Sequence, residues 1–291
     1  MHPRPFDYAR PETVADAIEA LGAAPGEASV LAGGQSLIPM MSLGLAAPDL
    51  VVDIGRLELA GSERRNGTVV LGALTRHREL ERSDELRDRL PLAADAARHI
   101  GNPRVRNRGT LGGSLSHADP AAELGAVALT YGGEVVIAGA SGERSVPIAE
   151  FFHGFFATAV GAGELLVRVD LELPPPGTGH GFSEIANRAD DFATAAATAL
   201  VTVGGDGNCA DARLALAGVA DRPIRFEQAG DLCRGEALSD GLLARVRRAV
   251  ADAVEPETDA FTSAGYRAQA AGICAARALE SAWRRGRGEA P

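Results

Sequence analysis

Two Gly-Gly segments restrict the fold of this chain more than any other feature of its sequence. The first, Gly33-Gly34, directly follows Ala28 to Leu31, a short apolar run that is typical of a buried strand. Glycine reaches backbone conformations that other residues avoid, so two glycines after a strand can turn several backbone N–H groups toward one point. Such a nest binds anions. We therefore predict that Leu31 to Ile38 holds an anion, with a pyrophosphate as the obvious candidate.

The second segment runs from Asn107 to Ser114 and contains Gly112-Gly113. Its glycines also free backbone amides, and the hydroxyls of Thr110 and Ser114 add hydrogen-bond donors. A helix carrying Glu123 is expected after it. Two anion-binding segments suit a dinucleotide better than a single phosphate, although the chain has neither G-x-x-x-x-G-K-[ST] nor a G-x-G-x-x-G between a strand and a helix.

The composition of the chain excludes several classes of protein and of mechanism. The 291 residues, 46% of them hydrophobic and 23% charged, suffice for one large or two ordinary domains with a sizeable core. The net charge of -10 argues against a nucleic-acid surface, because phosphate binding needs clustered cations. Every cation is an arginine, since the chain contains no lysine, and this excludes a Schiff-base or lysine-base mechanism. We expect no nucleic-acid partner.

The sequence offers no pattern of a metal centre, an export signal or a membrane span. Cys209, Cys233 and Cys274 lie far apart, and their spacing fits neither a zinc site nor an iron–sulfur cluster. The first ten residues carry two prolines and mixed charges in place of a secretory signal, and no stretch reaches the roughly 18 apolar residues of a membrane span. These features predict a cytoplasmic protein with free thiols, no metal ligands and no transmembrane segment.

Short strands alternate with helices along the chain, which predicts an α+β fold. Pro174-Pro175-Pro176-Gly177 forms a rigid segment at which we place a domain boundary. Phe6 to Leu21 is expected to hold a short strand and a helix. The other expected strands are Ala28–Leu31, Leu50–Ile54, Thr68–Leu74, Glu134–Ala138, Leu165–Leu173, Ala193–Val203 and Asp211–Val219, and the other expected helices are Thr75–Leu80, Leu90–Ile100, Ala121–Thr130, Leu243–Val254 and Tyr266–Trp283.

These segments resemble the FAD-binding medium subunit of the carbon monoxide dehydrogenase type, within the xanthine dehydrogenase superfamily of molybdenum hydroxylases. The resemblance extends over essentially the whole chain. Its most specific parts are Ala32 to Met41, Arg106 to Gly113 and His117 to Pro120. It implies a two-part FAD-binding domain of the vanillyl-alcohol-oxidase (PCMH) type over 1–176, with subdomains of about 1–55 and 56–176. A smaller α+β C-terminal domain over 177–291 would have a three-stranded antiparallel sheet and helices.

The resemblance also implies, by position, which residues hold a non-covalent FAD. The first segment would bind the pyrophosphate, and Glu123 would offer a carboxylate to cofactor hydroxyls. Ile100 would line the isoalloxazine, and Arg188 to Ala193 would cover the flavin face. No residue of the chain is expected to be catalytic in its own right. The complete set of expected FAD contacts is Leu31, Ala32, Gly33, Gly34, Gln35, Ser36, Leu37, Ile38, Ile100, Thr110, Gly112, Gly113, Ser114, Glu123, Leu166, Val167 and Phe192.

Three positions depart from the family pattern. Phe192 stands where some relatives place a tyrosine, so its ring can stack but cannot donate a hydrogen bond. Ser42 to Leu45 replaces a stretch that is often basic, and Ser183 stands where xanthine dehydrogenases carry a lysine. We still expect FAD binding with these changes, and they leave the electron acceptor open.

Other candidate residues are better explained by packing or by solvation. No two histidines have the i, i+4 spacing of a helical zinc site, and only His117 lies near the flavin by position. We interpret the Phe151 to Phe156 cluster as packing or as a contact to a partner subunit, and Asp190-Asp191 as solvated. Histidines interpreted as ordinary surface or core residues are His77, His99, His153 and His180.

A chain without cluster-binding cysteines and without an obvious substrate site is interpreted as one part of an enzyme. The resemblance implies two partners: a large subunit with the molybdenum cofactor and a small iron–sulfur subunit with [2Fe–2S] clusters, in a dimer of heterotrimers. Electrons would pass from the molybdenum centre through the clusters to FAD. From FAD they would reach an external acceptor such as oxygen, a quinone or NAD.

Two alternatives stay open. One is a stand-alone flavin oxidase, in which a histidine of the glycine loop is often bonded to the flavin. Gln35 occupies the nearest position here and cannot form that bond. The other is a nucleotide-binding assembly protein without redox activity. Intact glycine segments argue against loss of binding but do not address turnover.

Overall fold

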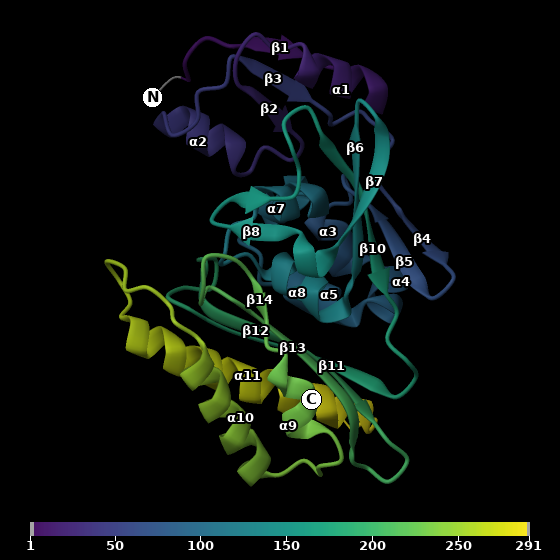
Figure 1. The fold of residues 1–291 in the computed structure, drawn as a ribbon, viewed down its shortest axis with the longest axis vertical. Coiled ribbons are helices and arrows are strands. Elements are labelled where there is room, and N and C mark those ends of the chain that lie inside the picture. Colours follow the sequence, from purple (N-terminus) through teal and green to yellow (C-terminus); the bar gives the residue numbers. More distant parts are fainter. Residues whose placement is uncertain (1–2, 290–291) are drawn as a thin grey trace.

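The computed structural model of this chain describes residues 3–289 and is organised around three main sheets (Figure 1). The N-terminal part is a parallel sheet in the order β1-β3-β2. Helix α1 begins after Thr13, whose side chain accepts a hydrogen bond from the N–H of Asp16 at 3.1 Å, and this cap satisfies one free helix donor. The bounds of this part are β1 Asp7–Ala9, α1 Val14–Gly22, β2 Ala28–Leu31, α2 Leu37–Leu43 and β3 Leu50–Asp53.

The middle part is a five-stranded antiparallel sheet in the order β4-β5-β10-β6-β7, with helices packed against it. Strand β10 comes last in the sequence but lies at the centre of the sheet, between β5 and β6. The strands are β4 Ser62–Arg65, β5 Thr68–Gly72, β6 Gly133–Gly139, β7 Gly142–Pro147, β8 Phe152–Gly154, β9 Ala157–Thr158 and β10 Leu165–Glu172. The helices are α3 His77–Arg82, α4 Asp84–Arg89, α5 Pro91–Ala97, α6 Pro103–Arg108, α7 Leu111–His117, α8 Glu123–Tyr131 and the 3-10 helix η1 Ile148–Glu150.

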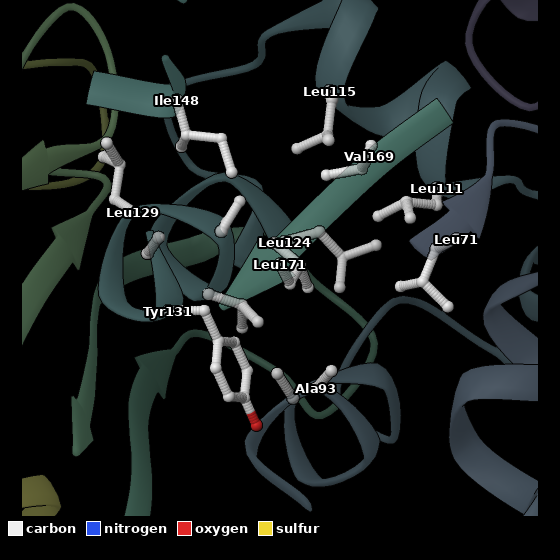
Figure 2. Packing of buried hydrophobic residues seen from close by; sticks show 14 of the residues in the cluster. Leu71, Ala93, Leu111, Leu115, Leu124, Leu129, Tyr131, Ile148, Val169 and Leu171 are labelled. Carbon is white, nitrogen blue, oxygen red and sulfur yellow. The ribbon is translucent and has the colours of Figure 1, made fainter. Parts of the chain in front are cut away.

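The core of the middle part lies between the sheet and helices α5, α7 and α8 (Figure 2). Leu71 and Val169 project from the sheet toward Leu111 and Leu124, and all four side chains are buried. Tyr131 is also fully buried, and its hydroxyl accepts a hydrogen bond from the N–H of Leu92 at 3.2 Å. This pairing removes the cost of burying an unsatisfied polar group and ties α8 to α5.

The C-terminal part is an antiparallel sheet in the order β11-β12-β13-β14, which lies between α8 on one face and the long helix α11 on the other (Figure 1). The resemblance implied a three-stranded sheet, and the structure has three long strands with β14 as a fourth, two-residue edge strand. Because β12 is buried on both faces, its sequence is a nearly continuous apolar run. The bounds are β11 Thr178–Ala186, β12 Ala193–Val203, β13 Cys209–Ala217, β14 Ile224–Arg225, α9 Gln228–Cys233, α10 Asp240–Ala253 and α11 Ala264–Gly286.

Polar contacts join the C-terminal part to the middle part. The guanidinium of Arg285 on α11 donates to the Asp95 carboxylate of α5 at 2.9 Å, and the ring of His180 lies 3.2 Å from the same carboxylate. Between β12 and α8, the hydroxyls of Thr198 and Thr130 are 2.7 Å apart and fully buried. The two parts therefore share a satisfied, partly buried polar interface in addition to apolar packing.

Several elements differ from the sequence prediction. The second glycine segment, which was expected to free its backbone amides for an anion, instead begins helix α7 at Leu111. Thr110 caps this helix by accepting a hydrogen bond from the N–H of Gly113 at 3.1 Å. None of the helices within residues 3–289 has both the length and the apolar character needed to cross a membrane. Other elements that the sequence did not predict are α2, β4, α4, α6, β7, η1, β8, β9, β11, β14 and α9.

Candidate functional site

A cleft of about 620 Å³ lies between the first Gly-Gly segment and helix α7. It brings together residues that are far apart in the sequence, from the N-terminal part, the middle part and the loop before β12. Predicted site residues that line it are Ala32, Gly33, Gly34, Gln35, Ser36, Leu37, Ile100, Thr110, Gly113, Ser114, Glu123 and Phe192. None of the residues lining the cleft in the described chain is an arginine.

The first segment presents a row of unused backbone donors. Within residues 3–289, the N–H groups of residues 33–37 have no hydrogen-bond acceptor in the protein. Gly34 adopts a φ of 73°, a left-handed conformation that favours glycine, and the Gln35 side chain donates to the Gly33 carbonyl at 2.9 Å. Five successive free amides beside a cleft are donors of the kind that binds anions in a backbone nest.

Gly33 also brings the two segments into direct contact. A Cβ atom at this position would collide with the carbonyl oxygen of Arg108 and would lie 2.9 Å from the Cα of Gly109. Only a residue without a side chain allows this approach. The spacing between the first segment and the backbone ahead of α7 therefore depends on Gly33.

From Leu111 to Ser114, the backbone amides of the second segment are used within the protein. The N–H of Gly112 donates to the carbonyl of Ala73 at 2.8 Å, and a Cβ on Gly112 would lie 2.6 Å from the Cβ of Ala73. Gly112 is thus a packing glycine, and it does not line the cleft. Gly113 and Ser114, on the next positions of α7, do line it. What this segment offers to a ligand is largely the hydroxyls of Thr110 and Ser114.

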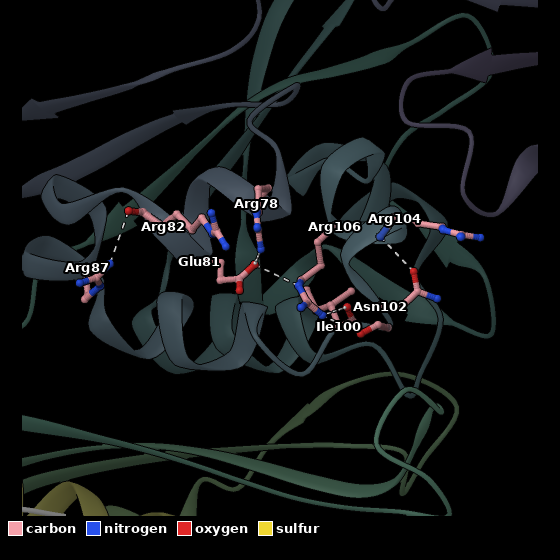
Figure 3. Close-up of polar contacts among 9 residues, drawn as sticks. Arg78, Glu81, Arg82, Arg87, Ile100, Asn102, Arg104 and Arg106 are labelled. Carbon is pink, nitrogen blue, oxygen red and sulfur yellow. Dashed lines mark hydrogen bonds and ion pairs between the residues drawn. The ribbon is translucent and has the colours of Figure 1, made fainter.

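A buried arginine holds the turn that carries Ile100 (Figure 3). The Arg106 guanidinium donates to the carbonyls of Ile100 at 3.0 Å and Gly101 at 2.6 Å. Its Nε donates to the Glu81 carboxylate at 3.0 Å, and Arg78 donates to the same carboxylate oxygen at 2.9 Å. These charge-assisted bonds fix the turn and keep the apolar side chain of Ile100 at the cleft wall.

Glu123 is the buried carboxyl group of the cleft. It lies in the first turn of α8, is 7% exposed, and contacts its own backbone N–H rather than a side chain of another described residue. Burial, with a smaller contribution from the charges of Glu184 and Asp119, raises the pKa of Glu123 to about 8. A buried carboxyl group that lines a cleft is suited to receive hydroxyl groups of a ligand.

Two histidines line the cleft as well. The ring of His117 packs against Phe156 with a centroid distance of 5.0 Å, and burial lowers the pKa of His117. The sequence analysis placed His117 near the cofactor by position. His77, which it interpreted as an ordinary residue, is 5% exposed and also lines the cleft. No local motif marks His77, because its neighbours in the fold are residues 109–110, more than thirty positions away.

The loop before β12 closes one side of the cleft. Asp190, Asp191 and Phe192 line it, and Phe192 is 68% exposed. This is the segment that was expected to cover a flavin. An exposed aromatic ring at a cleft edge can cover a planar ligand by stacking on it.

Five predicted site residues do not line the cleft. Ile38 is 45% exposed on α2, and Leu31 packs beside Gly34. Leu166 is buried in the core of the middle part, and Val167 faces a separate cavity of about 450 Å³ beside β4. The fifth residue is Gly112, for the packing reason given above. The resemblance placed Leu166 and Val167 near the cofactor by their position in the sequence. Neighbouring residues on a strand point to opposite faces, so such a position alone does not bring a side chain to the cleft.

Known protein families match nearly the whole chain. The family described as "FAD binding domain in molybdopterin dehydrogenase" matches residues 4–175, and the family described as "CO dehydrogenase flavoprotein C-terminal domain" matches residues 180–282.

Curated relatives are similar over almost their full length. The chain is 36% identical to subunit alpha of the 6-hydroxypseudooxynicotine dehydrogenase complex of Paenarthrobacter nicotinovorans, over 99% of this chain and 97% of that one. It is also 36% identical to the carbon monoxide dehydrogenase medium chain of Afipia carboxidovorans, over 97% of this chain and 98% of that one.

Solved structures agree with these matches. One chain of carbon monoxide dehydrogenase from Hydrogenophaga pseudoflava, in a form that lacks the Mo-pyranopterin moiety, superposes with a TM-score of 0.94 at 35% identity. That match covers 98% of this chain and 99% of the other. Quinoline 2-oxidoreductase from Pseudomonas putida 86 matches with a TM-score of 0.93 at 32% identity, over 98% of this chain and 99% of that one.

Proposed function

The chain belongs to the family of FAD-binding medium subunits of molybdenum hydroxylases, and we propose that it relays electrons between partner subunits and an external acceptor. It is an oxidoreductase subunit with a PCMH-type FAD-binding domain followed by a C-terminal domain. The relay would receive electrons from a molybdenum centre through a separate [2Fe–2S] subunit. Bound FAD supplies the redox chemistry, because it can take up two electrons and pass them on.

The row of free amides at residues 33–37 is the observation that carries the assignment of the cofactor site. These donors match the pyrophosphate of FAD in charge and in hydrogen bonding. Glu123 would receive hydroxyl groups of the cofactor, and Ile100 and Phe192 would contact its planar ring. The protein then binds and orients FAD and excludes water around it, without a catalytic side chain of its own.

Three finer proposals follow from family membership. The partners would be a large molybdenum-binding subunit and a small iron–sulfur subunit, assembled as a dimer of heterotrimers. The complex would work in the cytoplasm. We also place the domain boundary at residues 174–177, the segment that connects β10 to β11.

The first experiment is a visible spectrum of the purified full chain, followed by acid precipitation and chromatography of the supernatant. We expect a yellow protein that releases FAD, which is the behaviour of a non-covalent flavoprotein. A colourless protein that also fails to bind added FAD would contradict the proposal. Co-expression with candidate large and small subunits, followed by mass measurement of the purified complex, tests the partners separately.

A further inference from the structure

The residues that begin helix α3 contact three successive carbonyl groups ahead of α7. The backbone N–H of His77 donates to the carbonyl of Gly109 at 3.0 Å, and its ring Nε2 lies 3.0 Å from the carbonyl oxygen of Thr110. The guanidinium of Arg76 donates to the carbonyl of Arg108. Residues 76 and 77 therefore hold the backbone of 108–110 from one side.

The ring of His77 is held in one tautomer. A carbonyl oxygen can only accept, so Nε2 must carry the proton and donate to Thr110. Burial lowers the pKa of His77 to about 4, so the ring is neutral near pH 7. Its Nδ1 is buried without a hydrogen-bond partner in the described chain, and it lies against Gly109, where a Cβ would be 2.7 Å away.

These contacts determine which way the neighbouring donors point. In a trans peptide the C=O and the following N–H lie on opposite sides. The bond from His77 to the Gly109 carbonyl therefore turns the N–H of Thr110 away from α3, and this N–H has no acceptor among the described residues. Thr110 itself lines the cleft.

The same backbone also sets the position of the first segment. Gly33 packs directly against the carbonyl of Arg108 and the Cα of Gly109. A shift of the backbone at residues 108–110 would therefore also displace Gly33 and the free amides of residues 33–37. His77 is more than thirty positions from either glycine pair, yet it lies where it can fix the distance between the two segments.

We propose that His77 is a positioning residue for FAD: by holding the carbonyls of Gly109 and Thr110, it sets the spacing between the two segments that grip the pyrophosphate. This inference rests on the proposed function, since it assumes that the cleft binds FAD. The role requires a neutral donor at the Nε2 position. It does not require an ionisable group.

Two substitutions of His77 separate the donor from the ring. The amide of His77→Gln can donate at the Nε2 position, whereas His77→Asn places its donor near Nδ1 and cannot reach Thr110. FAD and ADP dissociation constants would be measured by fluorescence titration of the full chain, with the thermal midpoint of the FAD-free chain recorded for each variant. His153→Asn is the matched control, because the exposed His153 ring also lies near a carbonyl, that of Glu150 at 3.2 Å, but outside the cleft.

We expect His77→Gln to bind FAD and ADP within about threefold of the original chain, and His77→Asn to bind both about tenfold more weakly. The control should bind both ligands unchanged. Equal affinities for the Gln and Asn variants would overturn the inference, as would an Asn variant with the original affinity. A loss of FAD affinity without a loss of ADP affinity would also contradict it, since the pyrophosphate is shared. If the unaltered chain bound no FAD, the proposed function itself would fail.

Discussion

The two Gly-Gly segments are alike in sequence but opposite in how they use their backbone. In the first, the N–H groups of residues 33–37 have no acceptor in the described protein. In the second, the N–H groups of Leu111, Gly112, Gly113 and Ser114 all donate within the protein. The first segment therefore offers backbone donors to a ligand, and the second is a scaffold that presents side chains. A Gly-Gly pair indicates a close approach of the backbone, but it does not reveal what approaches.

The largest expected effect is a loss of stability on substitution of Gly112, the glycine that packs against Ala73 and does not line the cleft. Gly112→Val would place a side chain 2.6 Å from the Cβ of Ala73 and 2.9 Å from its carbonyl oxygen, in a backbone that cannot move freely. We expect the free energy of unfolding of the FAD-free chain to fall by at least about 3 kcal/mol. Urea denaturation followed by circular dichroism measures it.

Gly113→Ala is the control for that substitution. Its Cβ would meet only the hydroxyl of Thr110 within 3 Å, and a side chain can adjust. The control should unfold close to the original midpoint. A Gly112→Val chain as stable as the control would remove the distinction between scaffold and ligand-binding glycines.

A smaller effect, on affinity rather than on folding, is expected at the first segment. Gly33→Val would push against the backbone of Arg108 and Gly109 and separate the two segments. We expect the FAD dissociation constant to rise about thirtyfold, equivalent to about 2 kcal/mol, in a chain that still folds. Isothermal titration with FAD and a thermal melt of the FAD-free chain give both quantities. A folded variant with unchanged affinity would show that the contact between the segments is irrelevant to the ligand.

The smallest expected effect is a pH dependence of stability that comes from Glu123, a side chain on the α8 side of the cleft. The pKa of Glu123 is raised to about 8 from an ordinary value of 4.5, so between these pH values the folded chain keeps a proton that the unfolded chain releases. The contribution of Glu123 to the stability of the FAD-free chain should therefore fall as the pH rises, by at most about 1.4 kcal/mol between pH 6.5 and 7.5. Glu123→Gln should reduce this slope in urea denaturation series at several pH values.

The pH window for that measurement is set by neighbouring groups. His77, whose pKa is lowered to about 4, contributes stability that is lost only as the pH falls below about 6.5. Glu184 has a pKa raised to about 7 by burial, and it contributes a slope of the same sign as Glu123. A slope in Glu123→Gln equal to that of the original chain would assign the whole effect to Glu184 and would leave Glu123 without a special role.

Regular elements with a clear hydrophobic period were predictable from the sequence. The strand Ala28–Leu31 and the helix after Thr13 lie where they were predicted. Helix α7 was missed because its glycines are poor helix formers, and packing against Ala73 overrides that preference. Strand β11 was missed because Gly179 and Gly181 stand where apolar side chains would mark a strand. They allow the backbone of α11 to come close.

The cleft was predictable to the extent that it depends on local sequence. Twelve of the predicted residues line it, and the first Gly-Gly segment was recognised as a set of backbone donors. His77 could not be found in this way, since its role arises from contacts with residues 109 and 110. Leu166 and Val167 were predicted to be near the cofactor, but the structure places their side chains in other surroundings.

The central place of β10 in the middle sheet has a consequence for how the chain matures. Its partners β5 and β6 are synthesised well before it, but they pair with β10 rather than with each other. Until residue 172 has left the ribosome, both strands have an unpaired edge, and pairing at such sequence separation is slow. The cleft, whose α7 scaffold packs beside β10, would then be completed late in synthesis. Nascent chains stopped before β10 should therefore be prone to aggregation, and cofactor should be captured only after most of the polypeptide has been made.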